Sequence, residues 1–382
     1  MKLILSISII LLAVTPPLTR ASGGSFYAVW PVIDDQEEPQ IYGNIIVWQQ
    51  YVTKYRDYDI YIADINEPSD PYILTISDDN DQINPAVYNN IVVWQDYVIG
   101  RNSSDWDIQM VDISDPDNAI IYPVSSIAFN DERKPAIHGN TVVWQDGDEG
   151  SFDIFGADIT DPENPLEFAI GAFEYDQQNP DIYRMTVIWE DNFFGDWDIF
   201  GSDIWLRNNP VDFPIAVLEQ DQQNSAIWDD IVVWQDNYYG DWDIYAADIS
   251  EPNEPVEFEI CVYRAAQTNP DISGNIIVWQ DFRNDNWDIY GFNLATNREF
   301  QITDNINDQI NPSISGNNVV WQDYRDGHSQ IYAAILEGQD AAQFTYEPTN
   351  GTVGNFTPNF TNDFLTVPNR PKKQLDLDKI RR

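Results

Sequence analysis

The feature that most constrains this chain is an apolar phrase ending in Trp-Gln-Asp, which recurs along the whole sequence. It is clearest within residues 274–312, where a second phrase, Trp-Asp-Ile-Tyr, follows it. The tryptophan of the first phrase, or its counterpart, occupies seven positions: Trp48, Trp94, Trp144, Trp189, Trp234, Trp279 and Trp321. Neighbouring copies lie 42 to 50 residues apart, which is the repeat length of a β-propeller blade. The sequence therefore predicts an all-β, seven-bladed β-propeller.

Each repeat divides into four short strands. In the sixth repeat we expect an inner strand over residues 270–273 and a second strand over 276–280. The third strand is expected over 288–294 and the outer strand over 299–303. The apolar runs lack strict alternation, as strands buried on both faces do. The repeat thus predicts a blade of four antiparallel strands.

Turn-forming pairs separate the first two strands of most repeats. They are Gly43-Asn44, Asn89-Asn90, Gly139-Asn140, Asp229-Asp230, Gly274-Asn275 and Gly316-Asn317. Such pairs accept the positive φ angles of a two-residue hairpin. The fourth repeat has Tyr183-Arg184 at this place, which predicts a different or strained turn.

The two ends of the repeat region complement each other. Residues 26–33 form an apolar stretch before the first repeat, whereas the seventh repeat ends at residues 331–336 without an outer strand. We therefore expect the N-terminal strand to pair into the last blade. This pairing would close the ring and remove exposed sheet edges.

The termini lie outside the repeats. Residues 1–21 combine Lys2, an apolar run and Thr19-Arg20-Ala21, the pattern of a cleaved signal peptide. We expect a secreted protein, extracellular or on the cell surface, with the propeller over residues 22–340. Residues 341–382, rich in Thr, Asn and Pro with a basic end, are interpreted as a flexible tail. No later apolar run reaches membrane-spanning length, so we expect no membrane span, and a monomer.

Charge and residue usage narrow the function classes. The chain has 64 acidic and 19 basic residues, a formal net charge of −45. Such a surface repels phosphate backbones and anionic lipid, so we expect no nucleic-acid ligand and favour cations or basic partners. The single Cys261 rules out an intrachain disulfide, and His138 and His328 are too few for a histidine metal cluster. No Gly-x-Ser-x-Gly motif is present.

The repeats resemble TolB-type β-propeller blades, over roughly residues 26–337. Three features carry the resemblance: Asn-Pro before the inner strand, as at Asn269-Pro270, the Val-Val-Trp-Gln-Asp run, and Trp-Asp-Ile-Tyr from Trp287. The repeats are most similar to those found in tandem in exported surface proteins of methanogenic archaea and some bacteria. The resemblance implies a binding or scaffold module. Departures are Gln50 for Asp in the first repeat, Ser225 for Pro in the fifth, and His328-Ser329-Gln330-Ile331 for Trp-Asp-Ile in the seventh.

Acidic residues gather in the loops that a propeller places on one face. One set directly follows Trp-Gln or Trp-Glu and includes Asp96, Asp191, Asp236, Asp281 and Asp323. Further sets precede the third strand and the inner strand. One interpretation is a binding face for a hard cation, which makes calcium the candidate cofactor. The other is that these side chains cap turns by accepting backbone N–H groups, which their repetition in every blade favours.

Aromatic residues that break the repeat register are the ligand-contact candidates. Those placed in the loops of the acidic face are Tyr97, Phe193, Phe194, Tyr238 and Tyr239. The repeated tryptophans are instead expected in the core between blades. We expect a secreted, non-catalytic binding or cell-surface scaffold module for a protein or polysaccharide ligand. The alternative is a secreted carbohydrate-active enzyme, a polysaccharide lyase or glycoside hydrolase, that uses the carboxylates of this face.

Overall fold

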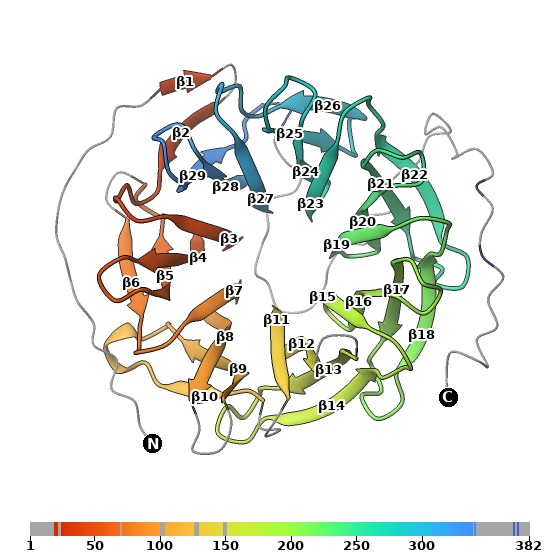
Figure 1. The fold of residues 1–382 in the computed structure, drawn as a ribbon, viewed down its shortest axis with the longest axis horizontal. Helices are drawn as coiled ribbons and strands as arrows, with labels where there is room; N and C mark the ends of the chain where they lie inside the picture. The colour runs from red at the N-terminus through yellow and green to blue at the C-terminus, as the bar shows by residue number, and fades with distance from the viewer. Residues whose placement is uncertain are drawn as a thin grey trace.

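The computed structural model is a ring of blades around a central channel (Figure 1). It describes residues 19–21, 24–68, 71–99, 104–125, 130–147, 151–338, 340, 370 and 373. These residues form seven antiparallel sheets, one for each blade. The all-β, seven-bladed fold predicted from the repeats is therefore confirmed. The one helical segment in the described parts of the chain is the 3-10 turn η1 (Pro116–Asn118).

The inner two strands of every blade carry the Asn-Pro position and the Trp-Gln-Asp phrase, or their counterparts, in that order. The innermost strands, which surround the channel in Figure 1, are β3 (Gln36–Tyr42), β7 (Gln82–Tyr88), β11 (Asp131–His138), β15 (Gln177–Tyr183), β19 (Gln222–Trp228), β23 (Gln267–Ser273) and β27 (Gln309–Ser315). The second strands are β4 (Ile45–Val52), β8 (Ile91–Ile99), β12 (Thr141–Gly147), β16 (Thr186–Asp191), β20 (Ile231–Asp236), β24 (Ile276–Asp281) and β28 (Asn318–Asp323).

The outer two strands complete each blade. The third strands are β5 (Asp57–Asp64), β9 (Ser104–Asp112), β13 (Asp153–Asp158), β17 (Asp198–Asp203), β21 (Asp243–Asp248), β25 (Asp288–Asn293) and β29 (Gln330–Ile335). The outermost strands of blades 1 to 6 are β6 (Tyr72–Ile76), β10 (Ile121–Pro123), β14 (Leu166–Gly171), β18 (Val211–Ala216), β22 (Val256–Cys261) and β26 (Arg298–Gln301).

The last blade is completed by the N-terminal strand β2 (Gly24–Ala28), which pairs antiparallel with β29 so that Phe26 lies opposite Ala334 (Figure 1). Ring closure is therefore as predicted, although the strand ends at Ala28 rather than Ile33. Beyond it the chain leaves the sheet, and the side chain of Ile33 is 88% exposed. A further strand, β1 (Thr19–Ala21), pairs with β2 at the expected signal-peptide cleavage site. Residues 1–18 lie outside the described residues.

Every inner strand contains a β-bulge that the sequence analysis did not place. In blade 6 the strand begins at Gln267, and the register shifts between Thr268 and Asp271. Asn269-Pro270 is therefore inside the strand, not before it as expected. The bulge residue has positive φ in all blades: Glu38, Asn84, Lys134, Asn179, Asn224, Asn269 and Asn311 have φ of 50 to 53°. Asparagine is enriched there because it tolerates the left-handed region better than most residues.

The hairpin turn of blade 4 has the same form as in the other blades but is strained, which is one of the two predicted alternatives. Arg184 takes the left-handed position with φ 54°, where Gly139 has φ 63° and Asp229 has φ 54°. The turn thus starts one residue later than expected. The chain accepts the cost of a bulky residue at positive φ, which is of order 1–3 kcal/mol.

The hydrophobic core lies between the blades. Each cluster of buried side chains in the described residues joins two neighbouring blades, as where Trp234 of blade 5 packs with Ile188 and Phe213 of blade 4. All seven repeated tryptophans are at most 1% exposed. The prediction that they form core rather than a ligand platform is confirmed.

A ring of hydrogen bonds runs through the blades next to the channel. The carboxamide oxygen of Gln235, in the Trp-Gln-Asp phrase of blade 5, accepts the backbone N–H of the bulge residue Asn269 in blade 6 at 3.0 Å. The same bond occurs at the other six junctions, from Asn84 to Gln49, Lys134 to Gln95, Asn179 to Gln145, Asn224 to Glu190, Asn311 to Gln280 and Glu38 to Gln322. The last of these joins blade 7 to blade 1 and closes the ring.

Blade 4 has a glutamate in this ring. Glu190 is fully buried, and burial raises the pKa of its carboxyl group. Its oxygens accept hydrogen bonds from Gln178, Asn179 and the backbone of Asn224. The position therefore requires an acceptor oxygen, and a carboxylate can supply it where extra donors are present.

We expect the closing strand to contribute strongly to stability. Phe26 is 8% exposed and meets Trp321 edge-on at 6.1 Å between ring centroids. Phe26→Ala should lower the free energy of unfolding by about 3–5 kcal/mol, measured by urea denaturation. Ile33→Ala, just beyond the strand, should change it by less than about 0.5 kcal/mol. Equal effects of the two substitutions would contradict closure by β2.

The carboxamide ring gives a second expectation. Gln235→Leu leaves the partly buried N–H of Asn269 without its acceptor and should cost about 1–3 kcal/mol of unfolding free energy. Gln235→Glu keeps the oxygen and has Gln223 in the place that Gln178 takes beside Glu190. It should therefore be clearly less harmful in the same denaturation measurement. If Gln235→Glu destabilises as much as Gln235→Leu, the acceptor role is wrong.

Candidate functional site

The aspartates that follow Trp-Gln or Trp-Glu lie at the ends of the second strands, and four of the five candidates point inward. Asp191, Asp236, Asp281 and Asp323 are at most 1% exposed. Each accepts the backbone N–H two residues further on, in Phe193, Tyr238, Arg283 and Arg325, at 2.8–3.0 Å. These side chains cap the following loop, which is what the second interpretation of the acidic sets predicted.

The fifth candidate aspartate, Asp96, and the aromatic candidate Tyr97 lie in blade 2, where the second strand is longer. Asp96 and Tyr97 both belong to β8 and pair with Asp107 and Trp106 of β9. Asp96 is half-buried and accepts a hydrogen bond from Gln82, and burial raises the pKa of its carboxyl group to about 7. Tyr97 packs on Trp106 at 5.1 Å. Both residues are therefore strand residues of blade 2.

The acidic set before the inner strands also caps backbone. Aspartate oxygens there accept N–H groups from residues within the first part of a third strand or just before it; the pairs are Asp35 with Ser329, Asp81 with Tyr58, Asp131 with Trp106, Asp176 with Phe152, Asp221 with Trp197, and Asp308 with Trp287. Within the described part of the chain, no group of three or more His, Cys, Asp or Glu side chains is arranged to hold a metal ion. The geometry thus gives the calcium interpretation no candidate site there.

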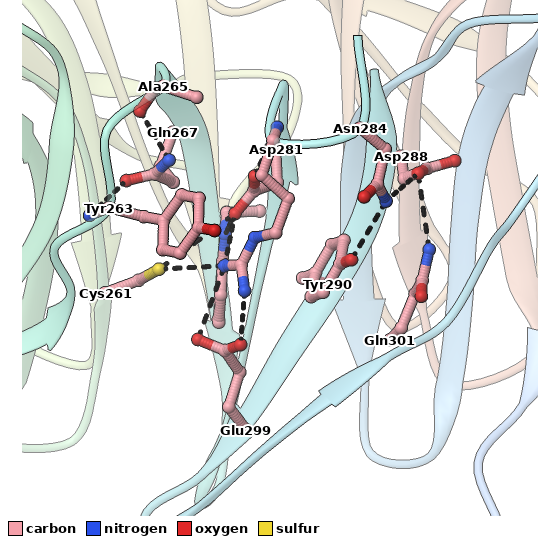
Figure 2. Close-up of polar contacts among 12 residues, drawn as sticks. Cys261, Tyr263, Ala265, Gln267, Asp281, Asn284, Asp288, Tyr290, Glu299 and Gln301 are labelled. Carbon is pink, nitrogen blue, oxygen red and sulfur yellow. Dashed lines mark hydrogen bonds and ion pairs between the residues drawn. The ribbon is translucent and has the colours of Figure 1, made fainter. Parts of the chain in front are cut away.

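Blade 6 contains a pocket that holds a guanidinium group. Figure 2 shows the carboxylates of Asp281 and Glu299 turned toward the same point, beside the sulfur of Cys261. Arg283 occupies that point, 2.6 Å from Asp281 and 2.7 Å from Glu299. Its guanidinium carbon lies 4.2 Å from the ring centroid of Tyr290. Two carboxylates and an aromatic face satisfy both the charge and the planar shape of arginine.

Blade 7 repeats this arrangement. Arg325 pairs with Asp323 at 2.6 Å and lies 4.3 Å from the ring of Tyr332. The closing strand supplies a second aromatic ring, Phe26, at 5.5 Å. In both blades the arginine comes two residues after the aspartate, so the loop fills its own pocket.

Blade 5 has the same pocket, but its arginine comes from the C-terminal segment. Arg370 pairs with Asp236 at 2.9 Å and with Glu257 at 3.2 Å. It lies 4.1 Å from the ring of Tyr245 and 5.4 Å from that of Tyr238. Its side chain is 3% exposed, compared with 15% for the arginine of blade 6. The residue is thus an integrated part of the blade and not the free tail residue expected from the sequence.

A second basic residue of the same segment contacts blade 4. The ammonium group of Lys373 lies 2.8 Å from Asp198 and also pairs with Asp196. It is 5.2 Å from the ring of Phe194, and its backbone N–H donates to the carbonyl of Val217. Burial raises the pKa of Asp198 to about 7, against the opposing effect of the lysine. Burial therefore disfavours the charged form of this carboxylate, and a cation at the position of Lys373 favours it.

We call these groups the interblade site: Asp236, Tyr238, Tyr245 and Glu257 of blade 5 with Phe194, Asp196 and Asp198 of blade 4. Of the predicted site residues, it contains Phe194, Asp236 and Tyr238. Phe193 packs on Phe194 at 4.9 Å, and Tyr239, 53% exposed, packs on Tyr238 at 5.0 Å. Asp191 lies in blade 4 but is not one of the groups of this site, and Asp281 and Asp323 belong to blades 6 and 7.

Several members of the interblade site were missed as site residues. Tyr245 and Glu257 were assigned to strands, and the expected tail over residues 341–382 was given no place on the propeller. The signal that could have found them is a comparison between repeats, since blade 5 lacks the arginine that blades 6 and 7 carry after Asp. The other residues of the expected tail lie outside the described residues.

Two carboxyl groups, Glu132 and Asp146, are buried in blade 3, close to Asp107 of blade 2. Glu132 has no exposed surface, and burial raises the pKa of its carboxyl group, with nearby Asp107 and Asp146 adding to the effect. The other blades have glutamine at the equivalent position, at the start of the inner strand: Gln36, Gln82, Gln177, Gln222, Gln267 and Gln309. A perturbed carboxyl group often marks catalysis, but here it replaces a structural amide.

We expect Glu132→Gln to stabilise the protein. The folded-state pKa of Glu132 lies above its ordinary value of 4.5. The contribution of the protonated Glu132 to the free energy of unfolding is therefore fully present below pH 4.5 and is lost as the pH rises through the folded-state pKa. The urea midpoint of the native protein should fall between pH 5 and pH 9, and the variant should flatten this decline. Glu174→Gln, an exposed change, serves as control, and identical pH profiles of both variants would contradict the assignment.

Comparison with known proteins bears on the fold. No protein-family profile and no curated protein matches this sequence. In the described residues no helix has the length and apolar character to cross a membrane. Similar solved structures include the β-propeller domain of the Trilobed protease from Pyrococcus furiosus, which is 10% identical with a TM-score of 0.59. That match covers 84% of this chain and 100% of the other.

Two peptidases are also similar in structure. A puromycin-hydrolyzing peptidase of Mycobacterium tuberculosis is 10% identical, with a TM-score of 0.57 over 75% of this chain and 50% of that one. The acylaminoacyl peptidase of Pyrococcus horikoshii is 11% identical, with a TM-score of 0.56 over 79% and 51%. The chain thus spans about half the length of these peptidases.

TolB structures are among the similar proteins, as expected from the sequence. TolB from Agrobacterium tumefaciens is 18% identical, with a TM-score of 0.40 over 53% of this chain and 73% of that one. At such identities, the likeness to the three propeller structures above concerns the fold alone. The chain is therefore a seven-bladed β-propeller, similar to the propeller domains of peptidases.

Proposed function

We propose that this chain is an exported, non-catalytic binding module whose acidic, aromatic-bearing face takes a basic segment of a protein. The observation that carries the proposal is the interblade site, in which Arg370 and Lys373 each contact a pair of carboxylates and an aromatic ring. A ligand with basic side chains at similar spacing would make the same contacts.

Electrostatics favour such a ligand. The formal charge of −45 gives the surface a field that attracts cations over several ångströms. Buried carboxylates such as Asp236 and Asp198 are costly unless a cation neutralises them, so binding of a basic group relieves that cost. Aromatic rings at the same place add the apolar contact that charge alone does not supply.

Exposed aromatic side chains continue this surface beyond the two pockets. Tyr239, Tyr263 and Phe282, from blades 5 and 6, are between 40 and 53% exposed. They lie in loops that follow the second or outermost strands. Tyrosine and phenylalanine at such places commonly anchor protein ligands. A partner segment therefore has apolar contacts available on either side of its basic residues.

The competing function, a carbohydrate-active enzyme, needs carboxylates that can reach a substrate. Most aspartates of this face accept backbone hydrogen bonds, and Asp281 and Asp323 also pair with arginine. Glu132, whose raised pKa would suit a general acid, has no exposed surface. These observations favour binding over catalysis. The peptidase activity of the similar proteins belongs to chains about twice the length of this one.

The binding test uses the full chain with Arg370→Ala and Lys373→Ala, so that the interblade site is free. The probe is an arginine nonapeptide, with a glutamate nonapeptide as control, measured by calorimetry at about 20 and 500 mM salt. We expect binding of the basic peptide only, weakened at high salt because screening shortens the Debye length to a few ångströms. Adding Asp198→Asn and Glu257→Gln should remove it. Cleavage of homogalacturonan or amylose, or no peptide binding at all, would refute the proposal.

A further inference from the structure

The pockets of blades 5, 6 and 7 share one construction. An aspartate at the end of the second strand accepts the indole N–H of the tryptophan two residues earlier, at 3.0–3.2 Å, in all three blades. The oxygen that accepts the indole N–H, Oδ2, also accepts a hydrogen bond from the guanidinium group, while Oδ1 accepts the backbone N–H of the loop. A tyrosine opposite the tryptophan, Tyr245, Tyr290 or Tyr332, has its ring centroid 4.1–4.3 Å from the guanidinium carbon, which lies over the ring. The strand register puts Glu257 and Glu299 at the same place in blades 5 and 6.

Blade 5 differs only in what its loop provides. Two residues after the aspartate, blades 6 and 7 have Arg283 and Arg325, but blade 5 has Tyr238. Tyr238 therefore lines the pocket of blade 5 instead of filling it. The lining is otherwise complete, so this pocket is a preformed receptor for an arginine from outside the blade.

We propose that blade 5 carries an arginine-specific pocket whose resident ligand is Arg370 of the same chain, so that a partner's arginine binds only by displacing the C-terminal segment. This inference rests on the proposed function and names both the ligand class and the regulation of that site. The ligand is a peptide segment with arginine followed three residues later by lysine, as in Arg370 and Lys373.

The chemistry of the pocket selects arginine over lysine. Two carboxylates from different strands, Asp236 and Glu257, bind separate nitrogens of one guanidinium group. The planar group also stacks on Tyr245. A lysine ammonium is a point charge and cannot bridge both carboxylates while lying flat on the ring. The blade 4 part of the interblade site discriminates less between arginine and lysine, because Lys373 contacts its carboxylates through a single nitrogen atom.

The connection within one chain favours the C-terminal segment as the resident occupant. Asp340 pairs with Arg298 on blade 6, adjacent to blade 5. The stretch from Asp340 to Arg370 can reach the pocket, since an extended chain covers about 3.3 Å per residue. A ligand tethered in this way has an effective concentration of about a millimolar. It therefore competes with any partner at ordinary concentrations.

The experiment compares peptide binding to full-length chains. The probe is a labelled peptide of residues 368–375, PNRPKKQL, with versions carrying lysine or citrulline in place of the arginine. The chains are the native protein, Arg370→Ala with Lys373→Ala, and that double variant with Asp236→Asn or Glu257→Gln added. The control variant adds Asp281→Asn, the matching residue of blade 6. Thermal melting checks that each chain is folded.

We expect the double variant to bind the native peptide at least about tenfold more tightly than the native chain does, because the tethered competitor is gone. The lysine and citrulline peptides should bind about 30-fold more weakly or worse, the loss expected when one partner of a buried ion pair is removed. Asp236→Asn and Glu257→Gln should each weaken binding similarly, whereas Asp281→Asn should not.

Three outcomes would overturn the inference. Equal binding by the native chain and the double variant would show that Arg370 does not occupy the site, while the proposed function would stand. Equal affinity for the arginine and lysine peptides would refute arginine specificity. Concentration-dependent dimers of the native chain that dissociate in the double variant would show that the segment docks on a second copy. A double variant that binds no basic peptide would instead refute the proposed function.

Discussion

The ring depends on a hydrogen bond repeated at every blade junction, from a bulge N–H to the carboxamide or carboxylate of the preceding blade. Blades are otherwise joined by apolar packing, which is strong but non-directional and so does not fix how neighbouring blades are shifted along the channel axis. A buried polar pair is directional, and leaving it unmade is costly. The hydrogen bonds therefore set the position of each blade relative to the next. The packing of the tryptophans between the blades depends on that position.

The same bond explains why Trp-Gln-Asp recurs as a unit. Successive residues of a strand point to opposite faces. In blade 5, Trp234 packs into the core and Gln235 reaches the next blade, while Asp236 caps the loop and faces the pocket. Three consecutive residues thus serve the core, the ring and the loop. A substitution of the tryptophan therefore disturbs the core, one of the glutamine the contact between blades, and one of the aspartate the loop.

The fold could be predicted because its signals are periodic. Spacing of the tryptophans, the hairpin pairs and the unpaired N-terminal stretch all report on strand packing, which repeats in each blade. The bulge at Asn269-Pro270 was missed, because proline was taken to precede the strand and not to stand at a position that donates no hydrogen bond. Such a position is defined by the neighbouring strand, which local sequence does not identify.

The candidate site was harder to predict, because it departs from the repeat. Asp236 and Tyr238 were found by their loop position, and Phe194 by its break in register. Glu257 and Tyr245 look like ordinary strand residues, and only the arginine from the far end of the sequence gives them a role. Contacts between Arg370 and blade 5 span more than a hundred residues and leave no local pattern.

Closure by β2 sets the order in which the molecule can be completed. Its partner β29 is the last strand of the propeller in the sequence, so β2 cannot pair with it until the rest of the propeller has been synthesised. Until then, blade 7 cannot form, and blades 1 and 6 each keep an uncovered apolar face. Contacts this distant in sequence form late and slowly. A chain that emerges gradually from a ribosome or a membrane channel therefore becomes a closed ring only after its whole propeller has been released.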